Sequence, residues 1–156
     1  MAKVFLGGVG SESAWREQVI PKLVIGYVNP LFHSKNAEVN EETRHQKIVN
    51  AATSNVKTPV NNSLFTSANP ASNTCDFLLY VITPLMKGFH LIPALVEDSN
   101  KKPEKTLLCV IFEENHTLFT PHQKKSLEAT GKMIERNGGR WLKSLDEVVN
   151  FLNSYQ

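Results

Sequence analysis

The stretch Lys3-Val4-Phe5-Leu6-Gly7-Gly8 decides the fold of this chain. A short apolar run starts almost at the N-terminus and stops at two glycines, and a helical pattern that carries Trp15-Arg16 follows it. This order is typical of a strand, a tight turn and a helix start in an α/β fold, where backbone N–H groups face a ligand's phosphate or sugar. The spacing of Gly7, Gly8 and Gly10 does not fit the G-x-G-x-x-G fingerprint, so the motif alone does not identify a dinucleotide site.

The alternation of strand and helix continues along the chain. We expect strands over residues 3–7, 24–28, 76–82, 106–112 and 140–142, and helices over 12–23, 40–52, 89–97, 121–136 and 145–154. The run from Asp76 to Ile82 is apolar throughout, which indicates a central strand buried on both faces. Together these elements predict a flavodoxin-like three-layer α/β domain with a five-stranded parallel sheet of order 2-1-3-4-5.

Capping residues mark several of the expected helix ends. Thr120 before Pro121 predicts a capped start, and Gly138-Gly139 predicts the end of the same helix. Ser11 or Ser13 is expected to cap the first helix. The expected helix over 89–97 contains Pro93, which has to lie near its first turn or kink the helix, and Asp98-Ser99-Asn100 is expected to follow its end.

Size and composition fit one globular domain of 156 residues, with a polar insertion over residues 53–74. The net charge of +2 and the absence of a block of like charge give no indication of nucleic-acid binding. No stretch resembles a signal peptide or approaches the roughly 20 apolar residues of a membrane span, so we expect a cytoplasmic protein. Cys75 and Cys109 lie at or in apolar runs and are expected to be buried thiols.

Several common sites are not indicated by the sequence. The five histidines have no ligand-like spacing to one another or to a cysteine, so no metal site is expected. The G-x-S-x-G elbow of hydrolases and the G-x-x-x-x-G-K-[ST] loop of nucleotide triphosphatases are both missing from the sequence.

The predicted sheet places a ligand at its topological switch point, beyond the carboxyl ends of the first and third strands. Those ends are Gly7-Gly8 and Thr83-Pro84. Trp15 follows the glycines and is either a core residue or part of the ligand's surroundings. Arg16 is either a solvated helix residue or a group that reaches a phosphate or carboxylate.

Several segments, in this order and spacing, resemble the nucleoside 2-deoxyribosyltransferase-like family. They cover most of the chain outside residues 31–74. The matching segments are Val4-Phe5-Leu6-Gly7-Gly8, Trp15-Arg16-Glu17, Tyr27-Val28-Asn29-Pro30, the run from Cys75 to Pro84, and the run from Glu97 to Thr106.

The resemblance implies a flavodoxin-like domain that binds a nucleoside or nucleotide at the switch point, without a cofactor or a metal. In the family's enzymes a glutamate attacks the anomeric carbon of deoxyribose and forms a covalent glycosyl-enzyme, and a second base or water then takes the sugar. The family often builds its pockets across subunits, so the resemblance also implies a homo-oligomer. The expected ligand-binding residues are Gly7, Gly8, Trp15, Arg16, Asn29, Pro30, Thr83, Pro84 and Gly88.

The sequence departs from the family at the position of the nucleophile, which corresponds here to Ala94. Alanine cannot act as a nucleophile. Glu97 is the candidate catalytic residue in its place, although a displacement of about 5 Å along the helix separates it from the expected position. The other interpretation of Glu97 is a solvated residue at a helix end. The polar insertion over 53–74 falls where the family places substrate contacts.

Three functions follow as hypotheses. The chain is an active nucleoside deoxyribosyltransferase or nucleotide N-glycosidase; or it is a catalytically degenerate protein that binds a nucleotide to sequester or sense it; or it is an interaction protein in which the insertion docks a partner. The first hypothesis requires a working nucleophile such as Glu97, whereas the second requires only the ligand-binding residues.

Overall fold

A computed structural model of the chain describes residues 1–8, 13–30 and 70–156. The expected helix over 40–52, the greater part of the 53–74 insertion and the expected cap Ser11 lie outside the described residues. The last five residues of the insertion are described and form the 3₁₀ helix η3 (Pro70–Thr74).

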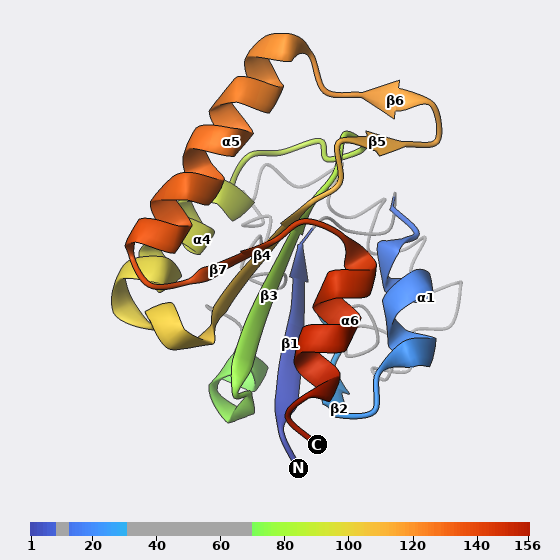
Figure 1. The fold of residues 1–156 in the computed structure, drawn as a ribbon, viewed down its shortest axis with the longest axis vertical. Helices are drawn as coiled ribbons and strands as arrows, with labels where there is room; N and C mark the ends of the chain where they lie inside the picture. Colours follow the sequence, from blue (N-terminus) through green and yellow to red (C-terminus); the bar gives the residue numbers. More distant parts are fainter. Residues whose placement is uncertain (9–12, 31–69) are drawn as a thin grey trace, which may run out of the picture.

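The centre of the molecule is a five-stranded sheet in which all neighbouring strands are parallel (Figure 1). The sheet order is β2-β1-β3-β4-β7, which confirms the predicted order, since β7 is the fifth strand of the prediction. The strands are β1 (Lys3–Gly8), β2 (Gly26–Val28), β3 (Phe77–Ile82), β4 (Thr106–Val110) and β7 (Arg140–Leu142).

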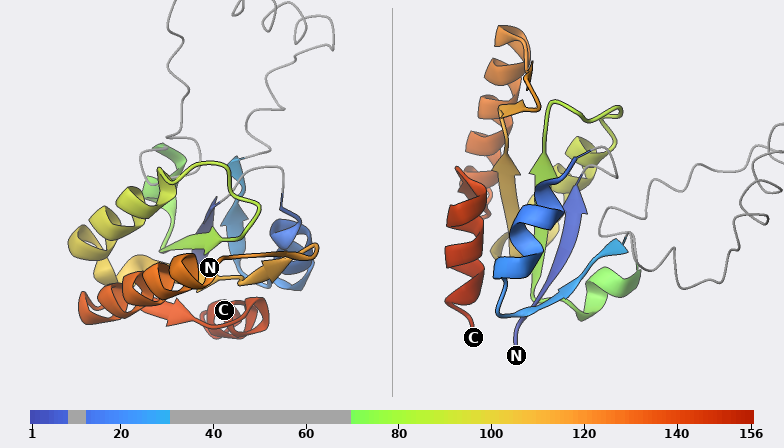
Figure 2. Two further views of the ribbon diagram at one scale, coloured as in Figure 1. Left: turned by 90° about the horizontal axis from the view of Figure 1, so that it is seen from above. Right: turned by 90° about the vertical axis from the view of Figure 1, so that its right-hand side faces the viewer.

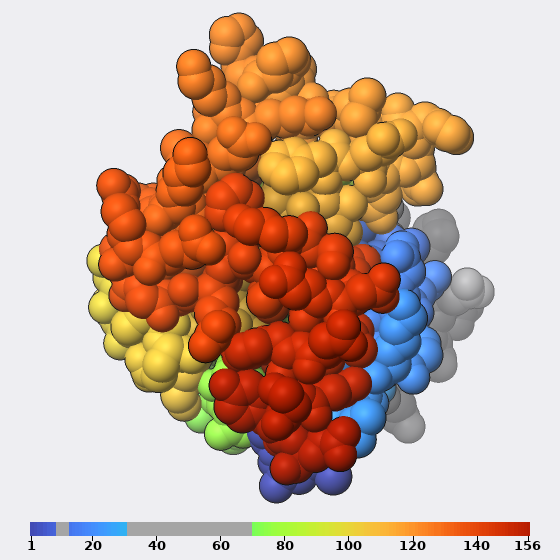
Figure 3. All heavy atoms as spheres, in the orientation of Figure 1, coloured from blue at the N-terminus to red at the C-terminus, as the bar shows by residue number. Residues whose placement is uncertain are grey.

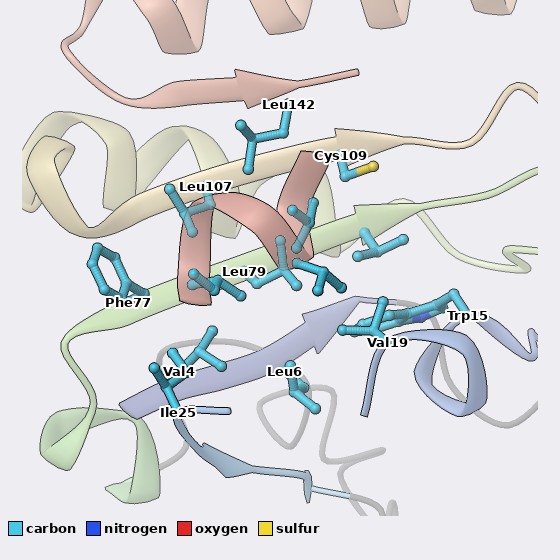
Figure 4. Close-up of a cluster of buried hydrophobic side chains, with 14 residues drawn as sticks. Val4, Leu6, Trp15, Val19, Ile25, Phe77, Leu79, Leu107, Cys109 and Leu142 are labelled. Atoms are coloured by element: carbon cyan, nitrogen blue, oxygen red, sulfur yellow. The ribbon is translucent and has the colours of Figure 1, made fainter. Parts of the chain in front are cut away.

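Helices cover both faces of the sheet and give the expected three layers. Alternate residues of β3 enter two separate cores, because successive side chains of a strand point to opposite faces. Leu79 packs with residues of α1 (Trp15–Val19) and α6 (Leu145–Asn153), and Figure 4 shows this core. Leu78 packs on the other face with α4 (Leu91–Lys101) and α5 (Pro121–Arg136). Figure 2 shows α4 and α6 on opposite sides of the sheet.

The expected helix over 12–23 is shorter in the structure than the sequence pattern suggested. α1 ends at Val19 and continues as the 3₁₀ helix η1 (Ile20–Lys22). The physical reason is Pro21, which has no backbone N–H to donate to the preceding turn of an α-helix. The strand over 24–28 likewise contracts to the three residues of β2.

The helix after β3 is longer than predicted and includes Asp98-Ser99-Asn100, which the sequence analysis placed beyond its end. The side chains of Ser99 and Asn100 both donate to the backbone O of Val96, each at 2.8 Å, so they bond back to the helix instead of ending it. Pro93 lies in the first turn, as expected. The 3₁₀ helix η4 (Pro103–Lys105) follows.

Other helix ends agree with their sequence signals. Thr120 Oγ1 accepts from the backbone N of Gln123 at 3.2 Å, and the Gln123 side chain accepts from Thr120 N at 2.8 Å, which completes a capping box for α5. Gly138 has a φ of +99° just beyond the helix end.

A small hairpin, which the sequence analysis did not predict, follows β4. It consists of β5 (Glu113–Glu114) and β6 (Thr117–Leu118), paired antiparallel. The two residues between them, Asn115 and His116, both have positive φ, 49° and 61°, as a tight hairpin loop requires. The expected strand over 106–112 therefore ends at Val110, and the chain crosses the carboxyl edge of the sheet before α5 begins (Figure 1).

Candidate functional site

The candidate residues gather at the carboxyl ends of three neighbouring strands. Gly7 and Gly8 end β1, Asn29 directly follows β2, and Thr83 directly follows β3. β1 lies between the other two strands, and Gly8 is the register partner of Val81. From β1 the chain passes to β2, which lies on one side of β1 in the sheet. β3 lies on the other side of β1, and the strands after it, β4 and β7, extend the sheet in that direction. This edge is therefore the switch point of the sheet, as predicted.

At Gly8 the backbone of β1 lies close to both β3 and α1. The φ of this glycine is +126°, a conformation that other residues rarely adopt. A Cβ atom added here would lie 2.7 Å from the backbone O of Val81 and 3.2 Å from Cζ2 of Trp15. The glycine therefore lets the backbone of β1 meet both neighbours at the edge of the sheet.

Trp15 is fully buried against this glycine and belongs to the core beneath α1 and α6 (Figure 4). The structure thus confirms the core interpretation of Trp15. Within the described residues its indole Nε1 has no hydrogen-bond partner. A buried N–H without an acceptor costs about 1–3 kcal/mol. Packing in the core therefore has to offset this cost and hold the indole in place.

Arg16 is buried as well, with 3% of its surface exposed, which excludes the alternative of a solvated helix residue. Its Nη2 donates to the backbone O of Leu6 at 2.8 Å, and its guanidinium lies 4.3 Å from the centre of the Trp15 ring. Burial lowers the pKa of Arg16 to about 10, which leaves the group cationic at neutral pH. The positive charge of Arg16 is therefore buried beside Leu6, near the carboxyl end of β1.

The turn after β3 is tightly held. Thr83 is fully buried, its Oγ1 accepts from Leu85 N at 3.2 Å, and its backbone O accepts from Met86 N at 3.1 Å. Pro84 and Gly88 are partly exposed along the segment that leads to α4. On the far side of β1, Asn29 and Pro30 are both buried.

Glu97 has a different environment from these residues. Its side chain is 62% exposed on α4 and forms an ion pair with Lys101 one turn along. The hydrogen bond and charge of Lys101 lower the pKa of Glu97. Ala94, the position that the resemblance assigns to the nucleophile, packs against the core between the sheet, α4 and α5.

Two pairs of polar residues were missed by the sequence analysis. The Ser13 hydroxyl donates to both carboxylate oxygens of Glu114, at 2.8 and 2.9 Å, so the hairpin meets the start of α1. The Tyr80 hydroxyl donates to the carboxylate of Asp98, and both side chains are buried. A signal for the second pair was present, because Asp98 continues the buried face of α4 at helical spacing from Leu95.

Within the described ranges, no three His, Cys, Asp or Glu side chains are grouped so that they could hold a metal ion. None of the helices in the described parts of the chain combines the length and apolar character that crossing a membrane requires.

The chain was compared with known proteins in three ways. No protein-family model matches it, no curated protein matches it, and no solved structure matches it.

Proposed function

We propose that this protein binds a nucleotide or nucleoside at the carboxyl ends of β2, β1 and β3. The observation that carries the proposal is the buried, cationic Arg16, whose guanidinium donates to Leu6 O beside the two glycines that end β1. A guanidinium offers a planar set of donors suited to phosphate and carboxylate groups. The switch point at the carboxyl ends of β1 and β3 is where sheets of this kind bind ligands.

The same geometry favours binding over glycosyl transfer by Glu97. A glycosidic nucleophile has to reach the anomeric carbon, whereas Glu97 is exposed and paired with Lys101, and Ala94 supports the core. We therefore propose the sequestering or sensing function, in which the ligand-binding residues act without a covalent step. The resemblance adds that the protein works as a homo-oligomer. Cys75 and Cys109, which are buried and form no disulfide, favour the reducing cytoplasm as its location.

Ligand-dependent thermal stabilisation tests the proposal. The panel pairs each deoxynucleoside with its 5′-monophosphate, because a contact with Arg16 favours the phosphate. A ligand at 100 times its Kd stabilises the folded state by about 2.7 kcal/mol, and we expect at least one monophosphate to raise the Tm.

Arg16→Lys keeps the positive charge but loses the planar set of N–H donors and the stacking on Trp15. It is therefore expected to reduce the rise in Tm that the monophosphate causes. Arg136→Lys, at the exposed end of α5, is the matched control and is expected to leave it unchanged. A protein that no member of the panel stabilises would contradict the proposal.

Release of free base from the same panel, measured by chromatography, distinguishes binding from catalysis. We expect no release. Release that disappears in Glu97→Gln would instead support the transferase or N-glycosidase hypothesis.

A further inference from the structure

The hairpin β5–β6 connects the end of β4 to the start of α1 through one carboxylate. Glu114 Oε1 accepts from Ser13 Oγ at 2.8 Å and from the backbone N of Ala14 at 3.1 Å, and Oε2 accepts from the same hydroxyl at 2.9 Å. Glu114 lies 100 or more residues further along the chain than its partners. Figure 3 shows atoms of the hairpin directly above those of the α1 segment.

The start of α1 depends on such a contact because the helix is short. Five residues are too few to form a stable α-helix by local hydrogen bonds, and no side chain caps the helix at Ala14. Ser13 passes the constraint on, since its Oγ also lies 3.4 Å from the backbone N of Trp15. The carboxylate of Glu114 therefore fixes the two residues that immediately precede Trp15-Arg16.

The hairpin is itself anchored in the sheet. Ile111, just after β4, donates its backbone N–H to the O of Ile82 at 2.8 Å, and Phe119 donates to the O of Phe112 at 3.4 Å across the base of the hairpin. Phe119 is buried in the core beneath α5. The position of Glu114 is thus set by β3, β4 and α5, and not by the flanking loop alone.

We infer that Glu114 is a positioning residue of the ligand site: through Ser13 and Ala14 it holds Trp15 and Arg16 against the end of β1. This inference rests on the proposed function for its consequence, since a displaced Arg16 presents its guanidinium less well to an anionic ligand. Its structural half, the immobilisation of Trp15, is independent of any ligand.

Tryptophan fluorescence tests the structural half. The chain has two tryptophans, so Trp141→Phe leaves Trp15 as the single emitter, buried and protected from quenching by acrylamide. In this background we expect Glu114→Ala to roughly double the quenching constant of Trp15, because the start of α1 opens locally. Glu113→Ala, on the same hairpin with an exposed side chain, is the matched control and is expected to leave quenching unchanged.

Rescue by the conservative variant separates positioning by hydrogen bonds from a loss of charge. In Glu114→Gln the remaining side-chain oxygen can still accept from both Ser13 and Ala14, as Oε1 does in the structure. We therefore expect quenching close to that of the parent. If Glu114→Ala does not fold, Ser13→Ala removes the hydroxyl alone and is expected to raise quenching in the same direction.

The consequence for ligand binding is tested by calorimetry, which measures the affinity for deoxythymidine 5′-monophosphate and the other deoxynucleoside monophosphates. We expect Glu114→Ala to weaken binding about tenfold through the loss of preorganisation, and Glu114→Gln and Glu113→Ala to bind like the parent. Unchanged Trp15 quenching in both Glu114→Ala and Ser13→Ala would overturn the inference, as would an equal rise in Glu113→Ala. A parent protein that binds no monophosphate but shows the quenching pattern would contradict the proposed function while leaving the positioning of Trp15 established.

Discussion

Gly8 occupies a position at the candidate site that a residue with a side chain does not fit. It combines a φ of +126° with a Cβ position 2.7 Å from the backbone O of Val81, which cannot move without disturbing the ladder between β1 and β3. We expect Gly8→Ala to destabilise the protein by about 1–3 kcal/mol or more in urea unfolding.

Gly88→Ala is the matched control for that substitution. The nearest neighbour of an added Cβ at Gly88 is the side chain of His90, at 3.3 Å, and that side chain is exposed and free to turn. We expect a much smaller change there. Equal effects of the two substitutions would contradict the importance of the close approach at Gly8.

The buried pair Tyr80–Asp98 ties β3 to α4. The Tyr80 hydroxyl donates to the carboxylate of Asp98, a residue that is 3% exposed. A buried carboxylate that loses a hydrogen-bond donor destabilises the folded state. We expect Tyr80→Phe to lower the free energy of unfolding by about 1–3 kcal/mol. Tyr27→Phe, whose ring is 44% exposed on β2, is the control and is expected to change it by less than about 0.5 kcal/mol.

The two cysteines are buried and unpaired with each other, as the sequence predicted. Burial raises the pKa of the Cys75 thiol and raises that of Cys109 to about 12. The thiolate is the reactive species, and a raised pKa reduces its population at any pH below that value. In Ellman's assay at about pH 8 we expect slow reaction of the folded protein and rapid reaction of both thiols in guanidinium; fast reaction without denaturant would contradict their burial.

At the scale of elements, the hairpin β5–β6 has a loop whose residues give only a weak turn signal in the sequence. Asn115 tolerates a left-handed conformation, but His116 at a φ of 61° occupies a position that most hairpins of this kind give to glycine. The sequence therefore does not predict a hairpin over residues 113–118, although it contains the turn residue Asn115.

Substitutions at His116 test this turn. We expect His116→Gly to raise the free energy of unfolding by about 0.5–1 kcal/mol and His116→Val to lower it by about 1–2 kcal/mol, because a β-branched side chain opposes positive φ. Thermal melts of the two variants should move in opposite directions. Movement in the same direction would mean that the backbone at His116 does not have this conformation.

Elements with strong local signals were predicted well. α5 begins after Thr120 and ends at Arg136, because a capping residue, a proline and a pair of glycines mark its ends. α1 ends early because of Pro21, a helix-breaking signal that the sequence does contain. The end of α4 was not predictable in this way, because it depends on the side-chain bonds of Ser99 and Asn100 to the backbone O of Val96.

At the scale of the whole molecule, the order of strands followed from the alternation of apolar runs and helices and from the handedness of parallel connections. That order predicts that Gly8 lies beside the turn at Thr83, and the pairing of Gly8 with Val81 confirms it. The burial of Arg16 and its contact with Leu6 were not predictable, since they depend on how α1 lies against β1. The support from Glu114 was equally hidden, because it joins segments 100 residues apart.

The most direct measurement of ligand binding at this edge is a titration of the ¹⁵N-labelled protein with deoxynucleoside monophosphates, followed by amide and indole resonances. We expect the largest shifts at Gly7, Gly8 and Thr83 and at the indole N–H of Trp15, with little change at Lys3 and Phe77, which begin β1 and β3 at the opposite end of the sheet. Shifts confined to the amino ends of the strands, or no shifts with any monophosphate, would contradict a ligand site at the carboxyl ends of β1 and β3.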